Sequence, residues 1–296
     1  MVASRTALAK LGIGAADPVD TALNFSGFDP GVTRELRDSN GTRGTFFKDG
    51  NRMTENRVVV TPTFSSEPTS AEWHTILAWA MAAPTGTTTK TYPFSDDTTE
   101  RYVHFKPNAG EEWFLTGVAV DTFNLRAASG EALTCDLGLC GRIPSVAHAT
   151  LPALTYDITL KPFILSQLVL TVDGVERKCR SFAAGVNYQI DKTRFLNSLY
   201  LTANYKLGTM VTFACEVPSG DNSGLWDQGI DGCSATAVFT NPGTSKILSL
   251  TWPDLRFPAR SPNHPPNAEG FLTIEAEAMR VGQASTDYPI QITLTA

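Results

Sequence analysis

Two neighbouring stretches in the middle of the chain alternate apolar and polar residues, and this alternation constrains the fold more than any other feature. Within Trp113–Cys140, apolar residues recur at every second position from Phe123 on the first arm and from Leu133 on the second, and polar or small residues lie between them. A period of two is the spacing at which a β-strand presents one face to a core and the other to solvent. Ser129-Gly130 separates the arms and supplies a turn. The stretch therefore predicts a β-hairpin. Its apolar set is Phe123, Leu125, Leu133, Cys135, Leu137 and Leu139, and its polar set is Thr122, Asn124, Arg126, Thr134 and Asp136.

Short runs of the same kind fill the rest of the chain. They are rich in Val, Thr, Phe, Leu and Tyr, and Gly, Pro, Asn and Asp separate them, which is typical of a protein built from many short strands. Phe271–Met279 repeats the alternation, with Glu275 and Glu277 in its polar set. We therefore predict a mostly β fold. The other predicted strands are Arg57–Phe64, Tyr102–Phe105, Phe163–Val172, Leu199–Tyr205, Met210–Val217, Ala235–Thr240, Lys246–Trp252 and Tyr288–Thr295.

One helix is predicted directly after Pro68. Thr69 and Glu72 have the spacing of a capping box, in which each side chain accepts a hydrogen bond from the backbone of the other residue. The helix should end before Pro84. We expect its apolar stripe to pack on a sheet, and His74 beside the stripe to be a surface or half-buried residue rather than a catalytic one. The stripe is Trp73, Ile76, Leu77 and Ala80.

The order of features repeats once along the chain. Each half contains a strand, a helical segment with a tryptophan, a pair of strands and a final alternating strand. Gly224 and Gly229 weaken the second helix, because glycine costs a helix about 1 kcal/mol relative to alanine. We interpret the repeat as a tandem duplication, although an all-β chain also produces such an order by chance. The predicted division is a first domain at 1–145, a proline-containing connector at 146–162 and a second domain at 163–296.

Two segments are predicted to be long loops. Arg37–Asn56 is polar and rich in turn residues, and Pro258–Glu269 contains four prolines. Loops of this length are usually functional or disordered. In a polymer, the first loop could reach the next subunit, and its candidate contact residues are Asn40, Gly41, Asp49, Gly50 and Asn51.

Charge and composition exclude several classes of function. Charged residues make up 18% of the chain, below the usual fraction of about 25%, as expected for a subunit buried among its neighbours. The net charge is −6, and Lys and Arg form no cluster. A protein that grips nucleic acid places such clusters against phosphates. We therefore expect no tight DNA binding, although a weakly acidic surface lets DNA pass without sticking.

No motif predicts an active site, a metal site or a cofactor. The four histidines are scattered, no nucleotide-binding fingerprint is present, and Asp96-Asp97 and Glu111-Glu112 are interpreted as solvated loop charges. The spacing of Cys135 and Cys140 is wide for zinc. We expect a protein that is not an enzyme. The first residues lack a signal-peptide pattern and no run reaches the ~20 apolar residues of a membrane helix, so no membrane contact is expected. The cysteines, expected to be reduced core thiols, are Cys135, Cys140, Cys179, Cys215 and Cys233.

Several segments together carry a family pattern. The densest is Trp113–Val120, where Trp113 and Thr116-Gly117 precede alternating residues. The order resembles the tail tube (major tail) proteins of bacteriophages with long, non-contractile tails. The weakened second helix and the proline-rich loop at Pro258–Pro266 depart from that pattern. The other matching segments are Leu11–Gly14, Glu72–Met81, His104–Pro107, Gly130–Leu133, Leu137–Gly141, Ser181–Tyr188 and Arg194–Asn197.

The resemblance implies a virion structural protein with a β-sandwich or half-barrel fold and a flanking helix. Copies in that family close into rings, the rings stack, and the inner strands merge into a barrel that conducts DNA during ejection into the host. A duplicated chain would supply six tube domains from three copies. We therefore favour a trimeric ring with pseudo-sixfold symmetry over a hexamer. Other implied partners are the tape measure protein and the tail terminator and tip proteins, with assembly in the host cytoplasm and a final location in the virion tail.

The resemblance also suggests roles for acidic residues on the polar faces. We expect Asp136, Glu275 and Glu277 to face the lumen, where they repel DNA phosphates. A face that is merely solvent-exposed is the alternative. Two other functions are possible: a host-adsorption or carbohydrate-binding β module at the tail tip or on a fibre, and a hydrolase with a β fold. The first would expose aromatic side chains for sugar stacking, and the second would need a His/carboxylate arrangement.

Overall fold

The chain is a mostly β protein, as predicted. The computed structural model describes residues 9–38, 53–95, 97–107, 111–145, 151–156, 160–221, 225–241, 244–258, 270–282 and 287–295. Strands account for 54% of the described residues and helices for 8%, so the predicted fold class is confirmed.

One antiparallel sheet of seven strands, here called the shared sheet, runs through both halves of the chain. Its order is β3–β6–β10–β9–β14–β15–β18. The halves join where β9 pairs with β14, with Ala128 opposite Ser181 and Thr122 opposite Asn187. The strands are β3 (Gly27–Asp29), β6 (Thr63–Ser66), β10 (Thr134–Cys140), β9 (Trp113–Ala128), β14 (Ser181–Asn187), β15 (Met210–Pro218) and β18 (Phe271–Ala278).

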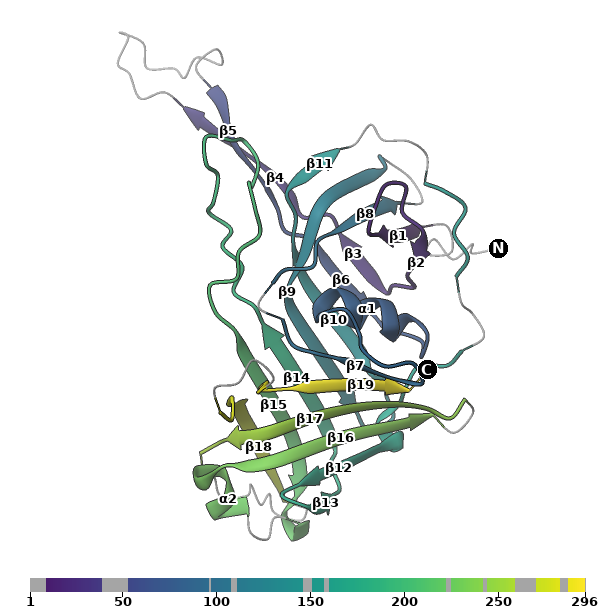
Figure 1. Ribbon diagram of the computed structural model, residues 1–296, viewed down its shortest axis with the longest axis vertical. Helices are drawn as coiled ribbons and strands as arrows, with labels where there is room; N and C mark the ends of the chain where they lie inside the picture. The colour runs from purple at the N-terminus through teal and green to yellow at the C-terminus, as the bar shows by residue number, and fades with distance from the viewer. Residues whose placement is uncertain are drawn as a thin grey trace.

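A second layer covers one face of the shared sheet (Figure 1). Its order is β13–β12–β16–β17–β19–β7, all antiparallel. β7 comes from the first half of the chain and β19 from its far end, so this layer also joins the two halves. The strands are β7 (Thr89–Tyr92), β12 (Leu168–Val172), β13 (Val175–Arg177), β16 (Cys233–Asn241), β17 (Lys246–Arg256) and β19 (Gln291–Thr295).

A smaller sheet shares the long strand β9. The first residues of β9 leave the shared sheet and pair with β8 and β11, which gives the order β2–β1–β8–β9–β11. Tyr156 anchors the predicted connector to this sheet, since Leu11 N donates to its hydroxyl at 2.9 Å. The added strands are β1 (Lys10–Gly14), β2 (Thr21–Ala22), β8 (Arg101–Lys106) and β11 (Ile143–Ser145).

Helix α1 (Glu72–Ala80) lies where the sequence placed it. The predicted capping pair forms: Thr69 N donates to Glu72 Oε2 at 2.8 Å, and Glu72 N donates to Thr69 Oγ1 at 3.4 Å. All four stripe residues are buried. The second helix, α2 (Leu225–Asp231), is short, and single turns of 3-10 helix occur at Leu165–Gln167 and Ser219–Asp221.

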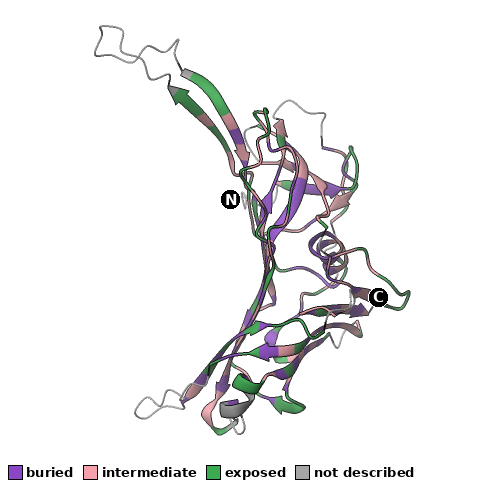
Figure 2. Ribbon diagram, turned by 60° about the vertical axis from the view of Figure 1, so that its left-hand side comes forward, coloured by how far each residue is buried: buried purple, intermediate pink, exposed green. Residues whose placement is uncertain are grey.

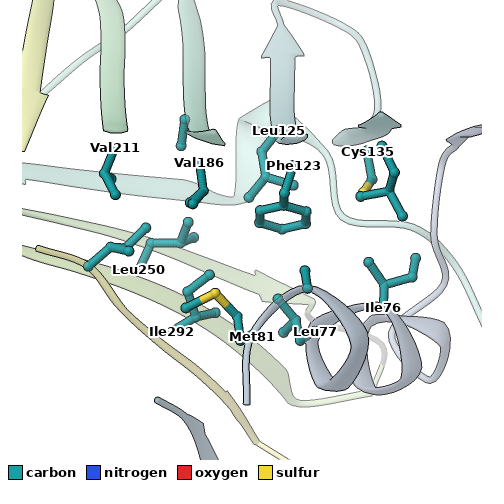
Figure 3. Packing of buried hydrophobic residues seen from close by; sticks show 14 of the residues in the cluster. Ile76, Leu77, Met81, Phe123, Leu125, Cys135, Val186, Val211, Leu250 and Ile292 are labelled. Atoms are coloured by element: carbon teal, nitrogen blue, oxygen red, sulfur yellow. The ribbon is translucent and has the colours of Figure 1, made fainter. Parts of the chain in front are cut away.

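A single large core lies between the shared sheet, the second layer and α1. Figure 3 shows Phe123 and Leu125 facing Leu77 of α1, while Val186 and Val211 face Leu250 of the second layer. Fully burying one such side chain contributes roughly 1.5–3 kcal/mol. The apolar side chains at every second position of these strands therefore stabilise the packing of the two layers.

β4 (Val32–Asp38) and β5 (Met53–Val60) form a separate two-stranded sheet that projects from the body (Figure 1). We call it the arm. Arg57 Nε lies 2.5 Å from Glu35 Oε2, and Arg34 Nε lies 3.7 Å from Glu55 Oε1. The prediction of a loop over all of Arg37–Asn56 was therefore wrong at both ends, where the strands extend into it.

Some predicted strands differ from the structure. Arg57–Phe64 divides into β5 and β6 around Pro62, which cannot donate to a ladder. The prediction of a strand at Leu199–Tyr205 was wrong, because this segment is irregular. It runs beside the arm, where Val58 N donates to Leu199 O at 2.8 Å. Leu199 and Tyr205 are exposed, whereas Leu201 is buried in the core. Strand propensity does not suffice without a partner strand.

The order of elements in the two halves is similar. β6–α1–β7–β8–β9–β10 in the first half parallels β15–α2–β16–β17–β18 in the second. The tandem duplication and its domain bounds remain predictions. Among the described residues, no helix is long and apolar enough to cross a membrane.

Candidate functional site

The face of the shared sheet that turns away from the second layer carries polar and small side chains. Along β15 and β18, buried residues alternate with partly or fully exposed ones. Figure 2 shows these strands following a long concave curve on one side of the molecule, with α1 on the other side. We call this surface the open face. One row of it crosses all seven strands through Gly27, Ser65, Asp136, Asn124, Gly185, Thr212 and Glu277.

The open face is acidic. Among the described residues of its strands, Arg126 is the one basic residue. Arg126 Nη2 lies 2.9 Å from Asp136 Oδ2. The ion pair removes much of the attraction that this guanidinium would otherwise exert on an anion. The carboxylates of the face are Asp29, Asp136, Glu216, Glu275 and Glu277.

The three predicted acidic residues all lie on the open face. Asp136 is near one side, where it also accepts a hydrogen bond from Ser65 Oγ at 2.7 Å. Glu275 and Glu277 project from β18, opposite Ala214 and Thr212, and both are exposed. The fold thus spreads the three carboxylates across the sheet rather than gathering them into a site.

The middle of the open face is nearly flat, since β14 carries Ala183 and Gly185 there. A Cβ at Gly185 would lie 2.7 Å from Asn124 Oδ1 and 2.8 Å from Thr212 Oγ1. Glycine therefore lets these two polar side chains close over the strand. The surface at the centre is built from short side chains without charge.

Each side of the shared sheet ends in a strand with an unpaired edge. Within the described residues, β3 pairs with β6 alone, and β18 pairs along its length with β15 but meets β17 through Leu255 and Arg256 only. Unpaired N–H and C=O groups at such an edge are a template for another strand.

Apolar side chains are exposed beside the edge of β18. Leu207, Met279 and Val281 are 72%, 38% and 52% exposed, and apolar side chains that gather on a surface are typical of interaction sites. Leu207 and Met279 line an open groove of about 880 Å³ that Tyr288 and Glu277 complete. The β18 side of the molecule therefore has the character of a protein-binding surface.

His74 and His104 each make structural contacts with neighbouring side chains. His104 is buried, and its Nε2 lies 3.1 Å from Glu112 Oε2. Glu112 also binds Lys106, and the hydrogen bond from Lys106 is the main reason that the pKa of Glu112 is lowered. Glu112 lies in a loop, as interpreted, but its contacts with Lys106 and His104 leave it only partly solvated. His74 contacts Lys90 and Tyr92, and burial lowers its pKa.

The cysteines are thiols in an apolar setting. All five are free, and all but Cys179 are buried, as expected of reduced core residues. Burial raises the pKa of Cys140 and Cys233 to about 11, so neither is a reactive thiolate. The described part of the chain contains no group of three or more His, Cys, Asp or Glu residues that could hold a metal.

Four tryptophans with described side chains offer little for sugar stacking. Trp73, Trp79 and Trp252 are each at most 2% exposed, and Trp113 is partly buried. The predicted contact residues Asn40, Gly41, Asp49, Gly50 and Asn51 lie outside the described residues.

Sequence reasoning missed the pairing that creates the open face, since the partner of β14 lies in the other half of the chain. The available clue was the alternation of Phe182, Ala184 and Val186, which marks β14 as a strand but does not name its neighbour. Arg126 was recognised as polar, but its pairing with Asp136 was not.

A family model described as "phage tail tube protein" matches residues 6–280 of the chain. No curated protein sequence matches it significantly.

Proposed function

Because this chain belongs to the phage tail tube proteins, a family of virion structural proteins, we propose that its copies close into rings and that the rings stack into a channel for DNA. The acidic open face supports this most directly. It is a concave polar surface on a protein that also has unpaired strand edges on both sides.

In this proposal the open face lines the channel. Asp136, Glu275 and Glu277 place negative charge along it, and the one arginine of its strands is paired. Like charges keep DNA phosphates from binding the wall, and the absence of a Lys/Arg cluster from the sequence avoids the phosphate contacts that hold DNA on other proteins. The short side chains at the centre keep the wall smooth.

In this proposal the ring closes through the two edge strands of the shared sheet, β3 and β18. Pairing β18 of one copy with the β3 side of the next would satisfy both edges and remove the hazard of open strands. The exposed apolar residues beside β18 would be covered by the same neighbour. Both halves of the chain contribute strands to one sheet, which supports three copies per ring with pseudo-sixfold symmetry over six. The tape measure protein and the terminator and tip proteins would bind this tube.

Electron microscopy of the purified protein tests the proposal. We expect stacked rings with a central hole, and tail shafts of the virion that contain the protein. A protein that stays monomeric at every concentration and is missing from the shaft would contradict it.

A disulfide crosslink tests the edges separately. β3 and β18 are six strand spacings apart in one chain, or roughly 29 Å, so Asp29→Cys and Glu275→Cys cannot be joined within a copy. We expect Asp29→Cys/Glu275→Cys protein to form chain-to-chain disulfides in rings, while each single variant does not. Rings without crosslinks from either this pair or Asp29→Cys/Thr273→Cys would exclude closure through these edges.

A further inference from the structure

A hollow interrupts the open face where β9 ends, β14 begins and β15 ends. Its volume is about 280 Å³, near the lower limit for small-ligand pockets of ~300–1,000 Å³. Small side chains meet there: Ala183 of β14 lies opposite Ala214 of β15, and Ser181 of β14 lies opposite Ala128 of β9. Methyl groups therefore form most of the floor of the hollow, on a face whose other side chains are mostly polar.

Two carboxylates flank this floor. Glu131 is exposed and follows β9 in the turn to β10. Glu216 is half-buried on β15, where it lies opposite Ser181 and accepts a hydrogen bond from Ser181 Oγ at 3.4 Å. At about 4.8 Å per strand, the backbone of Glu216 is roughly 10 Å from that of Ala128 at the end of β9. The two acidic groups therefore lie on opposite sides of the floor rather than beside each other.

The bases near the hollow bind other groups. Arg126, which also lines the hollow, forms its ion pair with Asp136, and the guanidinium of Arg180 lies 5.2 Å from the centre of the Phe271 ring. Within the part of the chain that the structure describes, neither flanking carboxylate belongs to an ion pair. An occupant of the hollow should therefore combine an apolar body with positive charge at two separated points.

An aliphatic diamine has this arrangement of groups. Its methylene chain gains free energy when an apolar floor removes it from water, and each ammonium group forms a charge-assisted hydrogen bond with a carboxylate. A divalent metal ion fits less well, because Mg²⁺ and Ca²⁺ gather their oxygen ligands at about 2.0–2.6 Å around a single point. The carboxylates of the hollow lie on opposite sides of its floor, so they do not supply such a cage.

We propose that the hollow binds a small aliphatic diamine such as 1,4-diaminobutane, with its carbon chain on the alanine floor and its ammonium groups at Glu131 and Glu216. All the groups involved belong to one chain, so binding does not depend on assembly. One consequence rests on the proposed function: in the tube, each bound diamine would offset two carboxylates of the channel wall. The concentration of diamine would then set how strongly the wall repels DNA.

Titration calorimetry of the purified protein tests the site. We expect 1,4-diaminobutane to bind once per chain. The monoamine 1-aminobutane has the same carbon chain but should bind at least about tenfold more weakly, because one carboxylate is left without its partner. Glu131→Gln and Glu216→Gln should each weaken diamine binding to the level of the monoamine. Glu111→Gln, which removes an exposed charge outside the hollow, is the matched control and should bind like wild type.

A substitution on the floor distinguishes a built site from loose association of counterions. Ala183→Ile fills the hollow while both carboxylates stay, and a β-branched residue suits a strand, so the variant should fold but lose diamine binding. If it does not fold, the two glutamine variants decide the question. Diamine binding that is unchanged in Glu131→Gln/Glu216→Gln, equal affinity for Mg²⁺, or no binding at millimolar diamine would overturn the inference. None of these results bears on whether copies form a tube, which electron microscopy tests separately.

Discussion

Glu112 has the most consequential local environment outside the open face. Its carboxylate accepts a hydrogen bond from Lys106 Nζ, contacts the buried His104 and accepts a hydrogen bond from Leu151 N at 3.4 Å. One side chain thus ties β8, β9 and the connector together. The sequence pair Glu111-Glu112 gave no indication of this, because two adjacent glutamates in a loop carry no signal of which one finds partners.

We expect Glu112→Gln to lower the free energy of unfolding by about 1–3 kcal/mol, since it leaves the partner groups without their charged acceptor. Glu111→Gln, at the exposed neighbour, should change it by less than about 0.5 kcal/mol. Urea denaturation measures both. Equal stability of the two variants at neutral pH would contradict the role of Glu112.

The difference in stability between wild type and Glu112→Gln should depend on pH, and the pKa of Glu112 sets the sign of that dependence. The pKa of Glu112 is lowered in the folded state from 4.5, so its contribution is complete above that value and is lost as the pH falls through the folded pKa. The difference between wild type and Glu112→Gln should therefore shrink at acid pH. A difference that grows on acidification would refute the assignment.

At the scale of elements, the arm depends on the turn that leads into it. Gly31 has a φ of +56°, and Thr61 N donates to its carbonyl at 3.0 Å. A Cβ at Gly31 would lie 2.1 Å from Thr61 O. Only glycine fits this approach, so the position fixes how the arm leaves the body.

Gly31→Ala should destabilise the protein by more than about 2 kcal/mol, because the left-handed conformation alone costs alanine about 1–2 kcal/mol and the contact with Thr61 adds to it. Gly27→Ala is the matched control, since a Cβ there meets nothing within 4 Å. Thermal unfolding of both variants is the measurement. A Gly31→Ala protein as stable as Gly27→Ala would show that the turn adapts.

Elements with strong local patterns were predictable. The β9–β10 hairpin and α1 each carry their own turn, cap or apolar stripe, so nearby residues suffice to define them. Leu199–Tyr205 failed because its partner would have had to come from elsewhere in the chain. Short strands such as β3 and β7 were missed for the related reason that distant neighbours, rather than their own residues, make them strands.

At the scale of the whole molecule, acidic residues scattered in sequence share one surface. The alternation predicted which side of each strand is polar, and Asp136, Glu275 and Glu277 were found on that side. Alternation carries no information on strand order, so it could not predict that β9 and β14 would merge two halves into one open face.

Charge reversal at Glu275 and Glu277 tests the role of this face. Phage assembled with Glu275→Lys/Glu277→Lys should deliver their genomes more slowly, because lysines attract the phosphates that the carboxylates repel. Glu111→Lys phage serve as the control for added positive charge. Delivery at the wild-type rate, measured by DNA release, would remove the repulsion hypothesis.

Ring size has an equally direct measurement. Three chains of 32.0 kDa give a ring of about 96 kDa, and six give about 192 kDa. Native mass spectrometry of isolated rings should find the smaller mass. The larger one would replace the trimer with a hexamer and leave the tube itself unaffected.

The pairing of β19 with β7 has a consequence for synthesis. Tyr92 and Ile292 are partners, yet a ribosome adding about 5–20 residues per second needs roughly 10–40 s to make the chain between them. Throughout that interval β7 lacks its partner, because β19 is the last strand of the second layer to be made. Translation itself therefore delays the moment at which a copy becomes competent to join others.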